Sequence, residues 1–439
     1  MSKKACRLVV ILSGTAVASL LSQNLSYAAH PFVEKTYTVQ KGGQTQSSEG
    51  TPAAGVTPKA GVTPKAGVTP KAGVTPKAGV TPKAGVTPKA GTESSPAKTT
   101  SSNKRARSWC SIASSADGTH LVAVENFGNI VTSSNSGVSW TNRTSAGERN
   151  WNSVASSSDG AKLVAVATTS TGLPGSPGGS IFTSADFGAT WTEQASAGKR
   201  WWASVTSNSD GTKLAATVMA SAQVVGTGSA MKKVIVGTLI FTSSNSGITW
   251  TAQNGSSAQN WGAIASSSDG THLAAAVLNG DIFTSSDSGV TWTDQANSGN
   301  QMWTSLASSA DGTHLIAIVD NGPGGDIFTS SDSGVTWTDQ VSAGSRYWYG
   351  VASDASGKKL AATENSGYIY TSSDFGVTWS ARKSVGEQGW NAIASSSDGS
   401  KLAAVPHSGN EGATMPIADV WTSLDSGATW TDQKSSSTR

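Results

Sequence analysis

Cysteine and charged residues are both scarce in this chain of 439 residues. With only 2 cysteines, no disulfide framework holds the fold. Charged residues make up 13% and hydrophobic residues 36% of the chain, which argues against a coiled coil, a helical bundle and a polytopic membrane protein. Glycine (49 residues) and tryptophan (16 residues) are abundant instead, and this composition favours strands and turns.

The N-terminus has the pattern of an export signal. A basic start is followed by an apolar run from Leu8 to Leu21, and Ser26-Tyr27-Ala28 offers a small-x-small cleavage site. A transmembrane anchor is the alternative, but the run is shorter than the ~20 residues that a span needs and contains Ser13-Gly14. We therefore predict a cleaved signal peptide over residues 1–28, no transmembrane segment after cleavage, and a secreted, periplasmic or cell-surface protein.

Cleavage would leave Cys110 as the remaining cysteine. Cys6 precedes the apolar run, so it is not placed as a lipoprotein cysteine. A single cysteine in an exported chain is either buried or paired between chains. Because Cys110 lies inside a predicted strand, we expect it to be buried.

Residues 29–108 differ in kind from the rest of the chain. The hexad AGVTPK occurs six times in register over residues 54–89, and its regular proline blocks both helix and sheet. With few large apolar groups, the segment is predicted to be a disordered, extended linker. It holds 12 Lys and Arg against 3 Glu, whereas residues 109–439 hold 16 basic and 25 acidic residues. The sequence thus predicts a basic stalk on an acidic body.

The linker has three possible roles. It is a solvated spacer, or its lysines bind an anionic cell-surface polymer or lipid headgroups. Its threonines beside proline could also carry O-linked sugar. Nucleic acid is not an expected partner, because the chain is predicted to be exported and the body is acidic.

From residue 109 onward the chain consists of seven repeats. Each begins with a motif close to W-x-S-I-A-S-S-x-D-G-T-x-L-A-A-V and ends with one close to I-F-T-S-S-D-S-G-V-T-W-T-D-Q. Fourteen of the sixteen tryptophans fall in two columns. The leading tryptophans are Trp109, Trp151, Trp202, Trp261, Trp303, Trp348 and Trp390, and the second column is Trp140, Trp191, Trp250, Trp292, Trp337, Trp379 and Trp430. Successive leading tryptophans lie 42, 51, 59, 42, 45 and 42 residues apart, a range typical of propellers and solenoids.

Each repeat contains four short apolar runs separated by turn signals. The runs are W-x-S-I-A-S, L-A-A-V, I-F-T-S and V-T-W-T. We therefore predict an all-β fold, a seven-bladed β-propeller of four-stranded antiparallel blades over residues 109–439. A β-solenoid is the alternative. Because each repeat contains its own four strands, blade 1 is expected to meet blade 7 by side-chain packing, unless residues just before Trp109 add a strand.

The turn before the fourth run resembles a known element. SSDSGVTW at Ser285–Trp292 and Ser330–Trp337 is similar to the Asp-box, S-x-D-x-G-x-T-W, of BNR and sialidase-like propellers, and related forms end at Trp191, Trp379 and Trp430. Asn135 and Asn245 replace the aspartate in two repeats. In this turn the Asp or Asn side chain accepts backbone hydrogen bonds, so its role is structural and not catalytic. The overall plan resembles single-propeller photosystem II assembly factors, which implies a protein partner on an arginine-lined face.

Enzyme activity is not expected. The resemblance to sialidases would imply an arginine triad, an R-I-P segment and a tyrosine–glutamate pair, but no R-I-P occurs and the body has few tyrosines. The xyloglucan hydrolases with Asp-boxes use two propellers, and this chain has length for one. Candidate general acids outside the turns are Glu125, Glu148, Glu364, Glu387 and Asp419, and nothing in the sequence pairs them. A glycoside hydrolase of sialidase-like fold stays the alternative.

Cofactor and metal sites are not expected either. His120, His272 and His314 share one repeat position, where other repeats have lysine, which indicates an exposed turn and not a ligand set. No cysteine–histidine cluster and no phosphate-binding loop is present.

One polar column is unusual, because two residues before each leading tryptophan stands only arginine or glutamine. Its members are Arg107, Arg149, Arg200, Gln259, Gln301, Arg346 and Gln388. They lie in the connection between blades, which in a propeller shares a face with the loop between the second and third strands. These loops vary in length, from Asn279-Gly280 to Ala220–Thr238. The Asp-boxes and Asp-Gly turns line the opposite face.

This Arg/Gln column and Trp151, Trp201 and Trp348 are the predicted binding residues. They would form a ring of donors and aromatic faces around the central channel that receives a glycan or an acidic peptide. In the alternative, the Arg and Gln side chains cap carbonyls of the adjacent blade and the tryptophans belong to the core. We predict an exported, monomeric, non-enzymatic recognition propeller that binds a protein or carbohydrate on one face. A purely architectural surface protein whose stalk makes the contacts is a further alternative.

Overall fold

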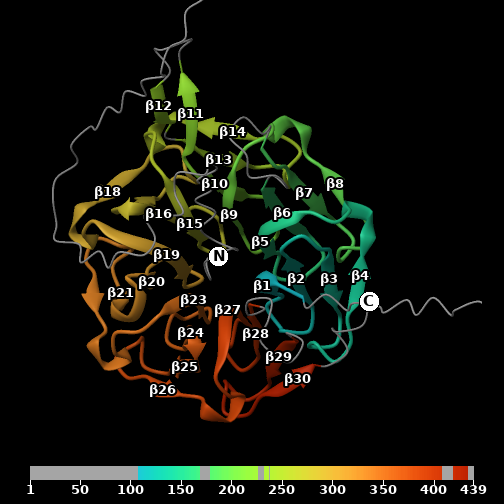
Figure 1. Ribbon diagram of the computed structural model, residues 1–439, viewed down its shortest axis with the longest axis vertical. Helices are drawn as coiled ribbons and strands as arrows, with labels where there is room; N and C mark the ends of the chain where they lie inside the picture. Colours follow the sequence, from blue (N-terminus) through green and yellow to red (C-terminus); the bar gives the residue numbers. More distant parts are fainter. Residues whose placement is uncertain (1–106, 169–177, 226–231, 237, 408–418, 434–439) are drawn as a thin grey trace, which may run out of the picture. The chain divides into compact units, whose positions relative to one another are not determined.

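The computed structural model describes residues 107–168, 178–225, 232–236, 238–407 and 419–433. The predicted signal peptide and nearly all of the basic linker lie outside the described residues. The described part is built from four-stranded antiparallel units arranged around a central axis, as Figure 1 shows. The predicted β-propeller is therefore confirmed. No helix among the described residues has the length and apolar character needed to cross a membrane.

The strands of blades 1 to 7 occupy equivalent positions. The innermost strands are β1 (Trp109–Ser114), β5 (Asn150–Ser156), β9 (Trp202–Ser207), β15 (Trp261–Ser266), β19 (Gln301–Ser308), β23 (Trp348–Ser353) and β27 (Gln388–Ser395). The second strands are β2 (Leu121–Glu125), β6 (Leu163–Thr168), β10 (Leu214–Val218), β16 (Leu273–Gly280), β20 (Leu315–Val319), β24 (Leu360–Gly367) and β28 (Leu402–Pro406). The third strands are β3 (Ile130–Ser133), β7 (Ile181–Ser184), β13 (Ile240–Ser243), β17 (Ile282–Ser285), β21 (Ile327–Ser330), β25 (Ile369–Ser372) and β29 (Val420–Ser423). The outermost strands are β4 (Thr141–Arg143), β8 (Thr192–Glu193), β14 (Thr251–Gln253), β18 (Thr293–Gln295), β22 (Thr338–Asp339), β26 (Ser380–Ala381) and β30 (Thr431–Gln433).

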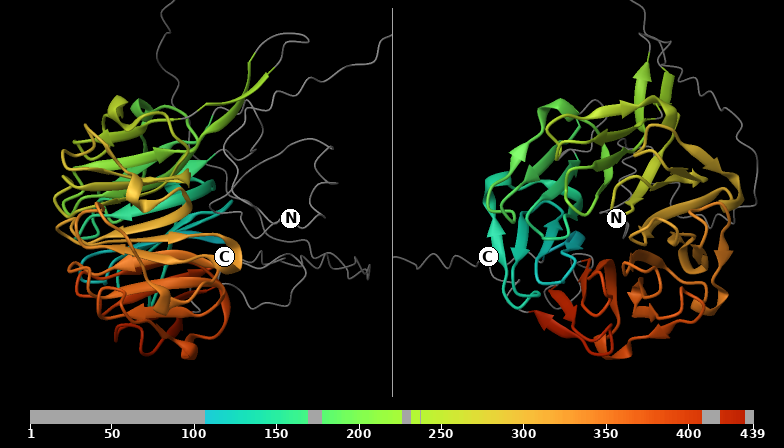
Figure 2. Two further views of the ribbon diagram at one scale, coloured as in Figure 1. Left: turned by 90° about the vertical axis from the view of Figure 1, so that its left-hand side faces the viewer. Right: turned by 180° about the vertical axis from the view of Figure 1, so that it is seen from behind.

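Short 3-10 turns connect most blades. They are η1 (Thr144–Ala146), η2 (Ala195–Ala197), η4 (Asn254–Ser256), η5 (Ala296–Ser298), η7 (Val341–Ala343) and η8 (Lys383–Val385), while η6 (Gly322–Gly324) lies in a loop of blade 5. Blade 3 carries an additional hairpin of β11 (Ser221–Val225) and β12 (Lys232–Val236), inserted between its second and third strands. Figure 2 shows this hairpin projecting beyond the blades. The longest of the variable loops has therefore become a two-stranded extension.

The fourth strand is shorter than the sequence pattern predicts. In blade 4 the predicted run V-T-W-T would begin at Val290, but β18 begins at Thr293. The reason is the turn chemistry: Asp287 Oδ1 accepts a hydrogen bond from the Thr291 backbone N–H at 2.9 Å, and the Thr291 hydroxyl donates to Oδ2 at 2.6 Å. Since these groups are committed to the turn, strand pairing starts only after the tryptophan.

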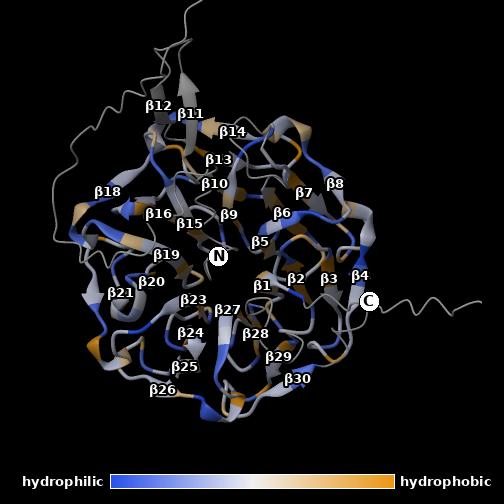
Figure 3. Cartoon of the chain, viewed as in Figure 1, coloured by the Kyte–Doolittle hydropathy of each residue, from blue (hydrophilic) through white to orange (hydrophobic). Residues whose placement is uncertain are grey.

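The exposed outermost strands β4 and β30 consist of polar residues, coloured hydrophilic in Figure 3.

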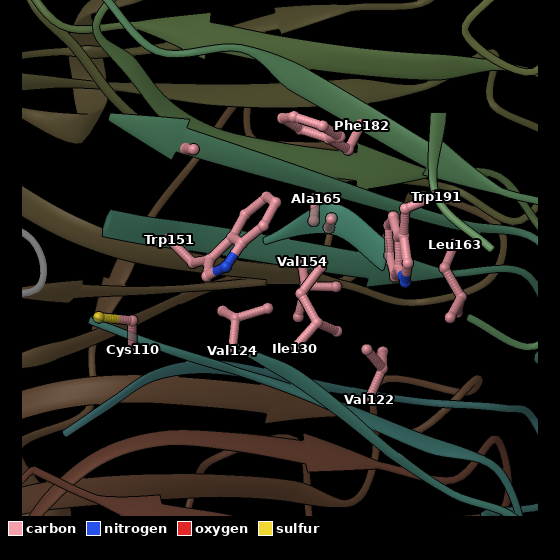
Figure 4. Close-up of a cluster of buried hydrophobic side chains, with 12 residues drawn as sticks. Cys110, Val122, Val124, Ile130, Trp151, Val154, Leu163, Ala165, Phe182 and Trp191 are labelled. Carbon is pink, nitrogen blue, oxygen red and sulfur yellow. The ribbon is translucent and has the colours of Figure 1, made fainter. Parts of the chain in front are cut away.

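The core consists of one hydrophobic cluster at each junction between blades. At the junction of blades 1 and 2, Val124 and Ile130 of blade 1 pack against Trp151 and Phe182 of blade 2, as Figure 4 shows. A corresponding cluster occurs at each of the other six junctions, including that between blades 7 and 1. Cys110 has no exposed surface, so its predicted burial is confirmed. The stability of the ring thus comes from the interfaces between blades as much as from the blades themselves.

The ring closes through backbone hydrogen bonds as well as packing, which corrects the expectation that side chains alone join blade 1 to blade 7. The residue before each Asp-Gly turn, or before the equivalent Ser356-Gly357 in blade 6, donates its N–H to a carbonyl of the corresponding turn one blade further on, and all seven bonds are present. They are Ala116 to Ser158, Ser158 to Ser209, Ser209 to Ser268, Ser268 to Ala310, Ala310 to Ala355, Ala355 to Ser397 and Ser397 to Ala116, at 2.7 to 2.8 Å. The Asn391 side chain adds a bond from Nδ2 to the Trp109 carbonyl at 2.6 Å. No strand is exchanged among the described residues, because every blade supplies its own four.

The Asp-Gly turns hold ionised carboxylates in networks of hydrogen bonds. Hydrogen bonds from the Ser115 hydroxyl and from the backbone and side chain of Thr119 lower the pKa of Asp117 to about 2. Asp311 has the same surroundings, and the Ser309 hydroxyl is the main cause of its pKa of about 2. In the last Asp-box the Thr429 side chain and backbone lower the pKa of Asp425 to about 2. These turns are therefore built around the charged form of aspartate.

This chemistry predicts loss of stability in acid. An aspartate whose folded pKa lies below its unfolded value of about 3.9 stabilises the fold above that value, and the contribution is lost as the pH falls through the folded pKa. We expect the thermal unfolding midpoint to stay level down to about pH 4 and to fall steeply between about pH 4 and pH 2. The Asp117→Asn/Asp311→Asn variant should show a shallower fall. A midpoint that does not change between pH 5 and pH 2 would contradict this account.

Candidate binding site

The two faces of the propeller carry the elements that the sequence assigns to them. In every blade the Asp-box turn donates a backbone hydrogen bond to the Asp-Gly turn, for example from Ser288 N–H to the Thr271 carbonyl at 2.9 Å. We call this side the Asp-box face. On the other side, the Arg/Gln column pairs with the loop between the second and third strands of the preceding blade. The pairs are Gly128 with Arg149, Gly179 with Arg200, Thr238 with Gln259, Gly280 with Gln301, Gly325 with Arg346 and Gly367 with Gln388. We call this side the loop face.

The leading tryptophans do not present their rings on the loop face. All seven have no exposed surface, and Trp151 and Trp348 are core residues at their blade junctions. The prediction that Trp151 and Trp348 offer aromatic faces to a ligand is therefore wrong, and the core alternative holds for them. The reason is that each indole lies at or near the start of an innermost strand, on the side that meets the preceding blade. Trp201, one residue before the buried Trp202, is half-buried and keeps an exposed edge.

The arginines of blades 2, 3 and 6 are held in one common arrangement. The Nε atoms of Arg149, Arg200 and Arg346 donate to carbonyls three residues earlier, at 2.8, 3.2 and 3.1 Å. Each guanidinium also lies over an aromatic ring of the third strand, 4.4 Å from Phe182, 4.2 Å from Phe241 and 4.7 Å from Tyr370. The capped carbonyls belong to the connection that precedes the blade, not to the adjacent blade as the structural alternative predicts. Arg200 is exposed and the other two are half-buried, so the guanidinium groups are both oriented and accessible.

The other members of the column differ. Arg107 is buried, 6% exposed, and pairs with Glu125 at 2.5 Å, so it does not belong to an accessible ring. Gln259, Gln301 and Gln388 are half-buried, and Gln259 Nε2 lies 3.4 Å from the Ser257 hydroxyl. The accessible cationic groups of the column are therefore confined to blades 2, 3 and 6.

Blade 6 brings tyrosines and glutamates together on the loop face. The Tyr370 hydroxyl donates to Glu364 Oε2 at 3.1 Å, the Tyr368 hydroxyl donates to Glu387 Oε1 at 2.7 Å, and Arg346 Nη1 lies 3.7 Å from Glu364 Oε1. Burial and the negative charge of Glu364 raise the pKa of Tyr370 to about 12. The raised pKa disfavours the phenolate form of Tyr370, but Glu364 lies within hydrogen-bond distance as a positioned base, so this arrangement leaves the glycoside hydrolase alternative open.

The other candidate acids are dispersed. Glu125 is bound to Arg107 in blade 1, Glu148 accepts a bond from the Asn129 side chain at 3.4 Å, and Asp419 is buried in blade 7. In the part of the chain that the structure describes, no three His, Cys, Asp or Glu side chains gather as metal ligands would.

The histidine column is a contact between blades and not an exposed turn, which corrects the sequence prediction. His120, His272 and His314 are half-buried, and each covers the glycine of the next blade's Asp-Gly turn. His314 also stacks on Phe375 of the next Asp-box, with ring centroids 4.8 Å apart. Lysine occupies the same position in the other blades, where Lys162 Nζ donates to the Asp210 carbonyl at 2.9 Å. Both residue types therefore fasten neighbouring blades together.

A pocket that the sequence does not predict lies in the wall of the central channel. The pocket holds a cavity of about 70 Å³ and is lined by the inner strands of blades 2 to 6. Small residues of the inner strands, Ala203 and Gly262, leave the space, and Met219, Leu278 and Met302 provide its apolar walls. Asp320 and Tyr349 complete the lining on the side of blades 5 and 6. The position directly after the leading tryptophan holds Ala203 and Gly262 in blades 3 and 4, but Asn152 and Tyr349 in blades 2 and 6. This difference in side-chain size is the only sequence signal of the pocket.

Charge is unevenly distributed over the loop face. Blades 2 and 3 present Arg149 and Arg200, whereas blades 4 and 5 each place two carboxylates next to each other. Burial and the neighbouring Asp294 raise the pKa of Asp281, and burial and Asp326 raise the pKa of Asp339 in the same way. Blades 4 and 5 thus place paired carboxylates on the loop face, whereas on blade 2 Glu193 lies near Arg149 and Lys199.

Comparison with known proteins supports the architecture. No known protein family matches the sequence, and no curated protein matches it. Solved structures do match: a GH74 enzyme from Niastella koreensis has 17% identity over 74% of this chain and a TM-score of 0.55. The GH74 xyloglucanase from Xanthomonas campestris has 13% identity over 75% of this chain and a TM-score of 0.57. YCF48 from Cyanidioschyzon merolae has 16% identity over 73% of this chain and 95% of its own, with a TM-score of 0.49.

These likenesses concern the fold alone. The match covers 54% of each GH74 chain, so this chain spans about half their length. Identities of 13 to 17% do not carry catalytic residues or ligands from one propeller to another, because one fold hosts many functions. The chain is a β-propeller, and membership of the Asp-box family stays a prediction from its turn motif.

Proposed function

We propose that this protein is an exported, non-enzymatic recognition propeller that binds a protein through its loop face. The observation that carries the proposal is the arrangement of Arg149, Arg200 and Arg346, each oriented by a carbonyl and an aromatic ring while its guanidinium remains accessible. Arginine presented in this way suits bidentate binding of carboxylates. The loops on this face also differ between blades, as binding loops of propellers do.

The Asp-box face is less suited to specific recognition. Its turns repeat the same hydrogen bonds in all seven blades, and its charged side chains are used in contacts within and between blades. A regular surface offers no distinct place for one partner. The partner class that the arginines favour is an acidic peptide segment, and an anionic glycan is the second possibility.

A peptide array and a glycan array probed with the full chain would test this proposal. The Arg149→Gln/Arg200→Gln/Arg346→Gln variant should bind acidic peptides at least tenfold more weakly, since each charged hydrogen bond contributes about 1.5 to 3 kcal/mol before solvent screening. Glutamine is the matched replacement, because the column itself has glutamine in blades 4, 5 and 7. The control is Arg143→Gln/Arg382→Gln, where both arginines donate from Nε to a third-strand threonine at 2.7 Å and other blades have glutamine.

Three results would contradict the proposal. Equal binding by the triple variant and the wild type would remove the arginines from recognition. Release of reducing sugar from xyloglucan or a sialoside, abolished by Glu364→Gln, would favour the glycoside hydrolase alternative. Binding by the stalk alone, with none by the propeller, would favour the architectural alternative.

A further inference from the structure

The mouth of the channel on the loop face is formed by two columns of residues. The first column consists of the residue directly before the leading tryptophan of each blade. The second column consists of a residue at the end of the second strand or directly after it. Backbone hydrogen bonds join them in pairs, with Met219 N–H to the Trp201 carbonyl at 2.8 Å and Asp320 N–H to the Met302 carbonyl at 3.0 Å. Leu278 N–H bonds to Asn260 and Asn365 N–H bonds to Tyr347 in the same way. The side chains of these pairs are therefore neighbours around the mouth.

The apolar residues of the two columns are confined to one side of the mouth. Blades 3 to 6 contribute the apolar residues Trp201, Met219, Leu278, Met302 and Tyr347 together with the polar residues Asn260, Asp320 and Asn365. Blades 7, 1 and 2 contribute polar or small residues at the same positions, which are Gly389, His407, Ser108, Asn126, Asn150 and Thr168. Both methionines of the described residues lie on the apolar side and line the pocket. Methionine is the side chain best able to adapt its shape to an apolar ligand group.

The size of the pocket limits what can enter it. A buried apolar cavity of about 150 Å³ admits benzene, and this pocket is about 70 Å³. The pocket is smaller than that, so an aliphatic or thioether side chain such as leucine or methionine enters it with less movement of its walls than an aromatic ring does.

The charges beside the pocket indicate what stands next to that side chain. Asp320 lines the pocket and is half-buried, and its Oδ1 accepts a bond from the Gly322 N–H at 3.1 Å. The carboxylate pairs Asp281–Asp294 and Asp326–Asp339 lie farther out on blades 4 and 5, and Asp294 and Asp339 belong to the outermost strands. Arg200 lies over Phe241 of the third strand and does not line the pocket. Charge complementarity thus favours a basic group toward Asp320.

We propose that this pocket anchors one leucine or methionine side chain of an extended peptide, with a lysine or arginine beside it toward Asp320. The inference rests on the proposed function and names the partner's chemistry, which is an apolar anchor next to a basic residue. The anchor enters the channel wall between blades 3 and 5, and the basic residue lies toward Asp320. The proposal excludes binding of an aromatic anchor or of a purely acidic segment in this pocket.

Methionine methyl signals of the full chain, labelled with carbon-13 at the methionine methyl groups, report on this pocket directly. The probes are capped hexapeptides Gly-Ser-X-Lys-Ser-Gly, in which X is Leu, Met, Phe or Ser. We expect the Leu and Met peptides to shift the signals of Met219 and Met302 and to bind at least tenfold more tightly than the Ser peptide. Ala203→Leu should abolish these shifts by filling the pocket, and Asp320→Asn should weaken binding severalfold at low salt.

The control variant is Asp332→Asn, which makes the same change in blade 5 on the Asp-box face, at a position where other repeats have asparagine. It should bind the peptides as the wild type does. Equal shifts with the Ser and Leu peptides, or none with either, would overturn the inference. If Ala203→Leu still binds acidic peptides through the arginines, the proposed function stands and the pocket inference alone fails. If the arginine variant binds acidic peptides as tightly as the wild type does and the Leu peptide still binds in the pocket, the proposed function fails and the pocket inference stands.

Discussion

Replacing Trp303 with alanine should lower the free energy of unfolding by about 3 to 5 kcal/mol, the cost of removing a large buried aromatic side chain. Trp303 has no exposed surface and lies at the junction of blades 4 and 5. Its ring meets the edge of Phe328 at 5.3 Å between centroids, and its Nε1 donates to the Gly299 carbonyl at 3.2 Å. Alanine would leave a cavity between two rigid sheets, which cannot collapse to fill it.

The second tryptophan of the same blade provides the matched control. Trp337 is only partly buried, near Trp303 with centroids 6.1 Å apart, and packs at the edge of the same cluster. Trp337→Ala should cost less than half as much as Trp303→Ala, because its exposed ring area gains less from burial. Guanidinium unfolding followed by far-ultraviolet circular dichroism measures both. Equal losses for the two variants would show that the leading column is not the principal stabiliser of the blade junctions.

The architecture could be predicted because all seven repeats carry the same motifs at the same positions. The runs W-x-S-I-A-S and I-F-T-S match β1 and β17 residue for residue, and the placement of the Arg/Gln column beside the variable loops is confirmed by six backbone pairings. Turn chemistry was harder to foresee. The fourth strands start late because the threonine before Trp292 is bound to Asp287 and is unavailable for sheet pairing.

Features that depend on contacts between repeats were not predictable from one repeat. The closing hydrogen bonds from Ser397 to Ala116 involve backbone groups, which leave no trace in the residue types. The burial of Trp151 follows from which side of the innermost strand meets the neighbouring blade, and alternation alone does not distinguish the two sides. The pocket arises where Ala203 and Gly262 leave space that only the assembled ring encloses.

A second large effect is expected at the ion pair of Arg107 and Glu125. Both side chains are buried, 5% and 4% exposed, with Nη1 and Oε1 2.5 Å apart. Glu125→Gln would leave a buried guanidinium without its counter-charge, and breaking a buried pair in this way costs about 3 to 5 kcal/mol. The exposed pair of Lys199 and Glu193 is the natural comparison, because its side chains are 51% and 38% exposed.

Glu193→Gln should cost no more than about 1 kcal/mol, since water screens an exposed pair. The Arg107→Met/Glu125→Leu variant removes both buried charges and should recover most of the stability lost by Glu125→Gln, because apolar residues of similar volume replace such pairs at little cost. Arg107 stands two residues before Trp109 at the start of β1, and Glu125 ends β2 opposite Trp109, so the pair holds the start of the innermost strand of blade 1 against the second strand. Denaturant unfolding of the three variants tests this role: if Glu125→Gln is no more destabilising than Glu193→Gln, packing holds the start of β1 and the charges are incidental.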